Sequence, residues 1–167
     1  MVLKKYLVST ALRPFINYFY ILEAHDTYYE SHPLGTFDLV FGQMGGSEFR
    51  GEEIVRASTN TTTLFFSQQE KPFALYLAPH TKHYVISFKP EGFYKIIKFP
   101  LAEMANTIWD ISDHLPPSFR YLNEVLLTSD SDEQAFQQLE DFCIGQLYRA
   151  NAVLTPFDQL LDYVRQN

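Results

Sequence analysis

The sequence predicts an α+β protein, in which an antiparallel sandwich or small barrel is followed by helices. Short apolar segments with alternating side-chain patterns, separated by turn residues, fill residues 15–88. From residue 90 onward, apolar residues recur at helical spacing instead. Strands followed by helices are typical of the α+β class. We assign the β-rich part to residues 1–89 and the helical part to residues 90–167, packed together as a single domain.

The β-rich part contains several candidate strands. In residues 16–23 (INYFYILE), strict alternation puts Ile16 on the same face as Tyr18 and Tyr20, with Phe19 on the other face. Further strands are expected after turn residues, with a charged one on a sheet edge at about 49–55 and the others at 37–41, 64–66, 73–77 and 83–88.

A strand changes into a helix within the segment 85–100 (VISFKPEGFYKIIKFP). Pro90 has no N–H for a strand ladder but fits the first turn of a helix, and apolar residues from Phe93 onward follow at helical spacing. Pro100 limits this helix to about two turns. We predict a hinge at Pro90 and Gly92, where a positive φ would explain the glycine.

Helical patterns continue to the end of the chain. A short helix is expected at 101–106, an irregular link at 109–111, a helix after Pro117, and a last helix from Pro156. Ser131 and Gln134 form a capping box before the longest helix. The apolar stripe of that helix either covers the barrel or forms a dimer or partner face, and its residues are Phe136, Leu139, Cys143 and Leu147.

The composition of the chain disfavours several classes of function. The chain has 167 residues, a formal net charge of −7 and one cysteine. The acidic balance disfavours DNA binding by this chain alone, because phosphate contacts need cationic side chains. A single cysteine excludes an intramolecular disulfide, and no apolar segment approaches the roughly 20 residues that span a membrane. We expect a cytoplasmic protein without a membrane partner.

Candidate catalytic and metal-binding residues are few. His80 and His83 have H-x-x-H spacing, but residues three apart on a strand point to opposite faces, so we predict no metal site. Ser67 and Ser87 lack a nucleophile elbow, and Cys143 lies on an apolar helical stripe. We therefore predict no catalytic residue, no cofactor and no enzymatic activity.

Aromatic residues make up 16% of the chain and occur at alternating strand positions. Two interpretations follow: the rings line a pocket for a small apolar or aromatic ligand, or they fill the barrel interior. The candidate pocket residues are Phe41, Phe65, Tyr76 and Tyr84.

Four segments carry a family resemblance. FKPEGFY at residues 88–94 is followed by PLAEM at 100–104, and RPFI at 13–16 and PLGTFDLVF at 33–41 precede them. Together they resemble the amino-terminal regulatory domain of AraC-type transcription activators, over residues 13–148.

The resemblance implies a cupin-like β-barrel (double-stranded β-helix) that senses a small-molecule effector, and a helical portion that often forms a homodimer. It also implies a helix-turn-helix DNA-binding domain, which would follow residue 167 and is missing here, so that DNA is contacted only through that domain. The hinge would couple effector binding to the helices. The alternatives are a cupin-type small-molecule-binding protein or enzyme, and a protein-interaction scaffold.

Overall fold

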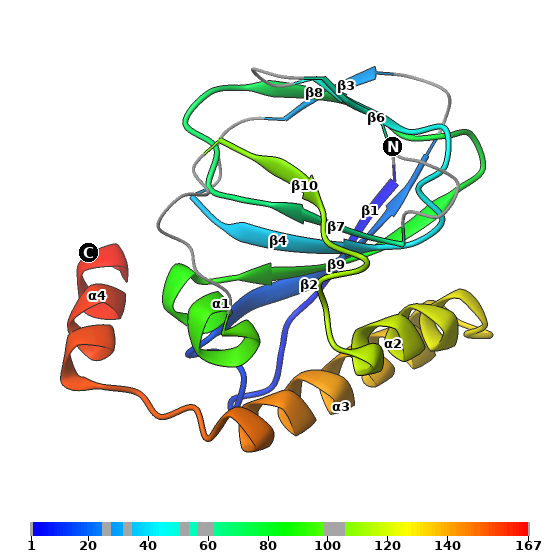
Figure 1. The fold of residues 1–167 in the computed structure, drawn as a ribbon. Helices are drawn as coiled ribbons and strands as arrows, with labels where there is room; N and C mark the ends of the chain where they lie inside the picture. Colours follow the sequence, from blue (N-terminus) through cyan, green and yellow to red (C-terminus); the bar gives the residue numbers. More distant parts are fainter. Residues whose placement is uncertain are drawn as a thin grey trace.

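The computed structural model describes residues 2–24, 28–31, 35–50, 54–56, 62–98 and 106–166. Two antiparallel sheets face each other, and helices cover the outer side of one of them (Figure 1). This arrangement agrees with the predicted α+β class, in which strands precede helices.

The larger sheet contains six strands among the described residues. All its neighbouring strands pair antiparallel. In spatial order they are β1 (Val2–Tyr6), β2 (Ile16–Glu23), β9 (Lys82–Phe88), β4 (Phe37–Phe41), β7 (Thr63–Phe66) and β10 (Ile108–Asp110).

The smaller sheet faces the larger one. Within the described part of the chain, its spatial order is β3 (Tyr28–Ser31), β8 (Phe73–Tyr76), β5 (Glu48–Arg50) and β6 (Ile54–Arg56). The prediction of one strand over 49–55 was wrong, because β5 and β6 pair antiparallel with each other. Phe49 of β5 is buried and faces inward, although the residues on either side of it, Glu48 and Arg50, are charged.

The strand predictions differ from the structure at three further places. The pattern did not predict β1 or β3, and it assigned an irregular link where β10 pairs with β7. These strands are short or follow polar sequence, so their pairing depends on a neighbour rather than on their own alternation. Because β10 lies after residue 90, the part of the chain predicted to be helical also contributes a strand to the larger sheet.

A bulge at the start of β2 changes the predicted faces. The register with β9 shifts between Ile16 and Tyr18. Ile16 therefore joins Phe19 in the core beneath the helices, whereas strict alternation had placed it with Tyr18.

The helices are α1 (Pro90–Ile97), α2 (Pro117–Leu127), α3 (Asp132–Ala150) and α4 (Pro156–Gln166). At the start of α3, Ser131 Oγ accepts a hydrogen bond from Gln134 N, as a capping box requires. Gln134 Oε1 accepts from Asp130 N, one residue earlier than the usual partner. Most of the helix expected at 101–106 lies outside the described residues.

The core on the helical side of the larger sheet is built from stacked rings. Phe93 of α1 lies 4.7 Å from Phe65 of β7 and 5.8 Å from Phe37 of β4, measured between ring centroids. Phe88 of β9 meets Phe93 edge-on at 5.5 Å. Such pairs favour one relative position of their rings, so α1 is fixed against three strands of the sheet.

Gly92 allows α1 to approach the start of β2. A Cβ atom built at Gly92 would lie 1.9 Å from the carbonyl oxygen of Phe15, and that oxygen accepts a hydrogen bond from Lys89 N at 2.9 Å. Gly92 is helical, and its φ is not among the positive values. The glycine is therefore needed for a close approach of two backbones, which corrects the expectation of a positive φ.

The long helix α3 is held to the sheet by charge as well as by apolar contact. Asp132 accepts from Lys82 Nζ of β9 at 2.8 Å and also forms an ion pair with Lys4 of β1. These contacts lower the pKa of Asp132, chiefly through the hydrogen bond from Lys4. Among the described residues, no helix combines the length and the apolar character needed to cross a bilayer.

Candidate functional site

A cavity of about 310 Å³ lies between the two sheets. This volume falls at the lower end of the range for small-molecule sites, roughly 300–1,000 Å³. Both sheets contribute to its wall, which consists of Leu3, Lys5, Tyr18, Tyr20, Leu22, Tyr29, Glu30, Thr36, Asp38, Val40, Phe49, Phe66, Ser67, Gln69, Phe73, Leu75 and Leu77.

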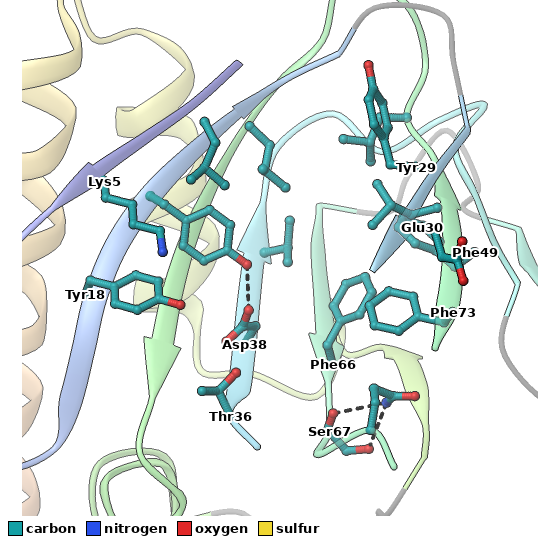
Figure 2. A pocket seen from close by; sticks show the side chains of 17 residues that line it. Lys5, Tyr18, Tyr29, Glu30, Thr36, Asp38, Phe49, Phe66, Ser67 and Phe73 are labelled. Carbon is teal, nitrogen blue, oxygen red and sulfur yellow. Dashed lines mark hydrogen bonds between the residues drawn. The ribbon is translucent and has the colours of Figure 1, made fainter. Parts of the chain in front are cut away.

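Most of this wall is apolar. Phe66 of β7 packs against Phe73 of β8 at 5.6 Å and edge-on against Phe49 of β5 at 5.3 Å, measured between ring centroids. Figure 2 shows these rings on one side of the cavity and Tyr18 and Asp38 on the other. The arrangement suits a compact, largely apolar molecule.

Asp38 is the most unusual residue of the wall. It lies on β4 between two apolar neighbours, and only 8% of it is exposed. Its Oδ2 accepts a hydrogen bond of 2.5 Å from the hydroxyl of Tyr20 (Figure 2). Burial raises the pKa of Asp38, and the nearby hydroxyls of Tyr20, Ser87 and Thr36 oppose this rise by hydrogen bonding. Burial and the Asp38 charge together raise the pKa of Tyr20 well above its usual range.

The second oxygen of Asp38 has no hydrogen-bond partner. Asp38 Oδ1 is buried and unpaired, and so is the hydroxyl of Ser87, the residue opposite Asp38 on β9. Buried polar atoms in folded proteins are nearly always paired, because an unpaired one loses its hydration without replacement. This part of the cavity is therefore the place where a polar group of a ligand would be stabilised most.

Other polar side chains of the wall are already paired. Ser67 Oγ donates to Thr107 O and accepts from Thr107 N, while Gln69 Nε2 donates to the carbonyl oxygen of Ser67. Lys5 is exposed, and its ammonium group lies 4.4 Å from the centroid of the Tyr18 ring. Lys5 thus supplies a cation beside Tyr18, on the side of the cavity opposite the phenylalanine rings (Figure 2).

The four predicted pocket residues do not line this cavity. Phe41, Phe65 and Tyr84 belong to the core between the larger sheet and the helices. Tyr76 is half-buried and packs against Tyr28 of β3, with 5.1 Å between ring centroids. The prediction chose the wrong face of the strands. Phe41, Phe65 and Tyr76 each have an adjacent residue that lines the cavity, and Val85, next to Tyr84, belongs to the core between the two sheets.

The residues that the sequence reasoning missed are those neighbours. Val40 precedes Phe41, Phe66 follows Phe65, and Leu75 precedes Tyr76, and all three line the cavity. Aromatic content alone does not distinguish the two faces of a sheet when both are buried. A usable signal was Asp38, an acidic residue inside an otherwise apolar strand.

The predicted dimer or partner face on α3 is internal. Phe136, Leu139 and Cys143 are buried in the core against the larger sheet, and Leu147 packs against that core. This supports the alternative in which the stripe covers the barrel. Burial, together with the charge of Glu140, raises the pKa of the Cys143 thiol, which suits a structural role.

The exposed apolar stripe lies on α4 instead. In Figure 1, α4 stands apart from the other helices, beyond an extended segment that follows α3. It is joined to α1 by Lys95, whose Nζ lies 2.5 Å from Asp158 Oδ2 and donates to Val153 O at 2.7 Å. The exposed apolar residues of α4 are Phe157, Leu160, Tyr163 and Val164.

The hinge residues lie where the prediction placed them. Pro90 is the first residue of α1, directly after Lys89, which caps the helix in an extended conformation. Gly92 lies in the first turn against the backbone of Phe15. The structure therefore joins β9 directly to α1 with no intervening loop.

The histidines of the H-x-x-H pair lie in different surroundings. His80 is exposed in a turn, whereas His83 is buried in β9. His83 Nε2 lies 2.8 Å from Thr81 Oγ1, and because Thr81 donates to Ala78 O, His83 is assigned as the donor to Thr81. Burial lowers the pKa of His83 to about 4. No cluster of three or more metal-binding side chains occurs in the described ranges.

Comparison with known proteins places the chain in a family. A family profile described as "Domain of unknown function (DUF6597)" matches residues 4–110. The chain belongs to this family. Among the described strands, the match covers all of β2 to β10 and the last three residues of β1. No curated protein matches the sequence.

Solved structures similar to the chain include EutQ of Clostridium difficile and ToxT of Vibrio cholerae strain SCE256. The EutQ match has 13% identity and a TM-score of 0.38, over 53% of this chain and 70% of that chain. Apo ToxT matches with 12% identity and a TM-score of 0.46, over 89% of this chain and 65% of that chain. ToxT with a bound unsaturated fatty acid matches with 11% identity and a TM-score of 0.46, over 89% of this chain and 62% of that chain. Because these scores are below 0.5, we infer function from the residues of the chain itself.

Proposed function

We propose that the chain is the effector-sensing domain of an AraC-type transcriptional regulator, with a cupin-like barrel whose cavity binds a small molecule. The observation that carries the proposal is a cavity containing a buried, half-unpaired carboxyl group, located on the sheet that leads directly into α1. The signature at residues 88–94 supports the same assignment. A scaffold domain would need no such cavity.

The cavity and the helices share the strands of the larger sheet. Asp38 lines the cavity, and the preceding Phe37 stacks on Phe93 of α1. A shift of β4 on ligand binding would therefore move a ring that packs directly against α1. A ligand produces such a change only if it binds one arrangement of the sheet and helix more tightly than the other.

From α1 the contact continues to α4. Desolvation by itself raises the pKa of Asp158, but hydrogen bonds from Lys95 and Thr155 outweigh it and lower the pKa to about 2. The Lys95 to Asp158 ion pair therefore persists at neutral pH and links α1 with the exposed stripe of α4. In this proposal α4 passes the effector signal onward, and any DNA contact is made by a further domain.

A ligand titration with the neutral probe 2-naphthol tests the proposal. We expect saturating 2-naphthol to raise the melting temperature and to slow amide hydrogen exchange in α1 and α4, since a ligand that binds only the folded state stabilises it. Val40→Phe puts a ring into the cavity and should weaken binding at least tenfold. The matched control Val153→Phe changes an exposed position outside the cavity and should leave binding unchanged.

Two outcomes would contradict this function. Absence of 2-naphthol binding would favour a scaffold whose interior takes no ligand. Binding that slows exchange only around the cavity, with α1 and α4 unaffected, would indicate a binding protein in which the helices receive no signal.

A further inference from the structure

We propose that the ligand of this cavity is an apolar, ring-containing molecule bearing a hydrogen-bond donor, a hydroxyl or amine group, that binds Asp38 Oδ1. The inference rests on the proposed function and specifies the chemistry of its effector. The observations behind it are the unpaired Asp38 Oδ1 and the side chains that surround it in the cavity.

The first step is the location of the free acceptor. Five buried side-chain atoms without a hydrogen-bond partner occur among the described residues, and of these only Asp38 Oδ1 belongs to a residue of the cavity wall. Asp38 is more than nine-tenths buried. An unpaired oxygen there gains a full hydrogen bond from a ligand donor without giving up a protein partner.

The second step is the remaining capacity of the carboxyl group. An ionised carboxylate offers about four acceptor positions on its two oxygens. Tyr20 occupies one of them, on Oδ2. The hydroxyls of Ser87, opposite on β9, and of Thr36 also lie near the carboxyl group, and even if both donated to it one acceptor position would stay open.

The third step excludes other ligand chemistries at this end of the cavity. Against the ionised form of Asp38, an ether or ketone would place an acceptor against an acceptor, and a carboxylate would add like-charge repulsion. The hydroxyl of Tyr20 already donates to Asp38. A donor on the ligand is thus the complement of Asp38 Oδ1.

The fourth step concerns the body of the ligand. Phe49, Phe66 and Phe73 form an aromatic wall, and aliphatic residues complete it. A planar ring fits between such side chains with favourable offset or edge-on contacts. The cavity volume of about 310 Å³ accommodates a fused two-ring system with a short substituent.

The test uses four probes with one ring system: 2-naphthol, 2-naphthylmethylamine, 2-methoxynaphthalene and 2-naphthoate. Dissociation constants are measured by calorimetric titration on the full chain. We expect the alcohol and the amine each to bind about tenfold more tightly than the methyl ether, as the loss of one hydrogen bond to a charged group implies. The carboxylate should bind most weakly.

Two variants assign the preference to Asp38. In Asp38→Asn the amide oxygen can still accept from Tyr20, but an NH₂ donor replaces the free oxygen. The alcohol-to-ether ratio should then fall to about one. The matched control Ser67→Ala removes a cavity hydroxyl that is already paired with Thr107, and it should retain the tenfold ratio.

The outcomes separate this inference from the proposed function. Equal binding of alcohol and ether to the wild-type chain overturns the inference but leaves the cavity as a binding site, and it does so even if Asp38→Asn fails to fold. A preference that survives Asp38→Asn also overturns it. Tightest binding of 2-naphthoate would overturn it in favour of an anion held by Lys5, and no binding of any probe would overturn both proposals.

Discussion

The two faces of the larger sheet are both buried, but they differ in what they bury. On the helical face, Phe37, Phe65 and Phe93 stack closely on one another and leave no polar side chain among them. On the inner face, Val40 and Val85 lie beside Asp38, Ser87 and His83, and each of these three polar residues has an unpaired buried atom. One face is packed for stability, whereas the other retains space and unpaired polar atoms, as binding sites do.

Adjacent residues on β7 test this difference with the largest expected effect. Phe65 is fully buried among rings on the helical face, and Phe66 lines the cavity. Phe65→Ala should lower the free energy of unfolding by about 4 kcal/mol, because it opens a void in a packed core. Phe66→Ala only enlarges an existing cavity, so we expect a loss of about 2 kcal/mol.

Urea unfolding of both β7 variants measures these losses. Equal losses for Phe65→Ala and Phe66→Ala would mean that the two faces are packed alike, and the contrast drawn above would fail.

Two glycines on helices sharpen the comparison at the hinge. Gly92→Ala should cost about 3 kcal/mol, because its Cβ would overlap the carbonyl group of Phe15 and force backbone movement. Gly145→Ala on α3 is the matched control, since a Cβ there would meet no atom within 4 Å. It should stabilise the protein by up to about 1 kcal/mol through helix propensity. The stability of both variants is measured by thermal unfolding. A stability of Gly92→Ala close to that of the wild type would show that α1 can move away from β2 at little cost in free energy.

Over the pH range that is measured, His83 gives a smaller loss than the destabilising variants above. Its pKa is about 4 in the folded chain, below the ordinary value of 6.5. The unfolded chain therefore binds the proton first as pH falls, so stability is complete above pH 6.5 and is lost toward pH 4. The loss should approach about 1.4 kcal/mol per pH unit within this window.

Measurement between pH 7.5 and pH 5.5 isolates His83 from most carboxyl groups. His83→Gln should show a shallower dependence of unfolding free energy on pH than the wild type over this range. Identical slopes would indicate that His83 titrates normally, and hence that this part of the inner face is hydrated.

The secondary-structure elements differ in how well the sequence predicted them. Helix α1 was predicted from Pro90 and the following apolar residues, and α3 from its capping pair, because these signals are local to the chain. Strand β2 was predicted, but its bulge was not, since a register shift depends on the partner strand. Strands β1, β3 and β10 were missed for the same reason.

A cavity lined in part by aromatic rings was one of the two interpretations of the sequence, but the residues assigned to it were wrong. Aromatic alternation correctly indicated strands with two buried faces, yet Phe41 and Phe65 were assigned to a pocket that their neighbours Val40 and Phe66 line. Periodicity gives the two sets of side chains on a strand without saying which set faces a cavity. Asp38 carried the missing information, because a carboxyl group inside an apolar strand needs a polar partner.

By itself the sequence determined that most strands precede the helices, where the change from strand to helix occurs at Pro90, and the family signature that surrounds it. These depend on backbone restrictions and periodicities that act over a few residues. Only the tertiary structure decided which face of each strand encloses the cavity, why Gly92 must lack a side chain, and that the exposed apolar stripe lies on α4 rather than α3. Each of these depends on contacts between segments far apart in the chain, which no local pattern records.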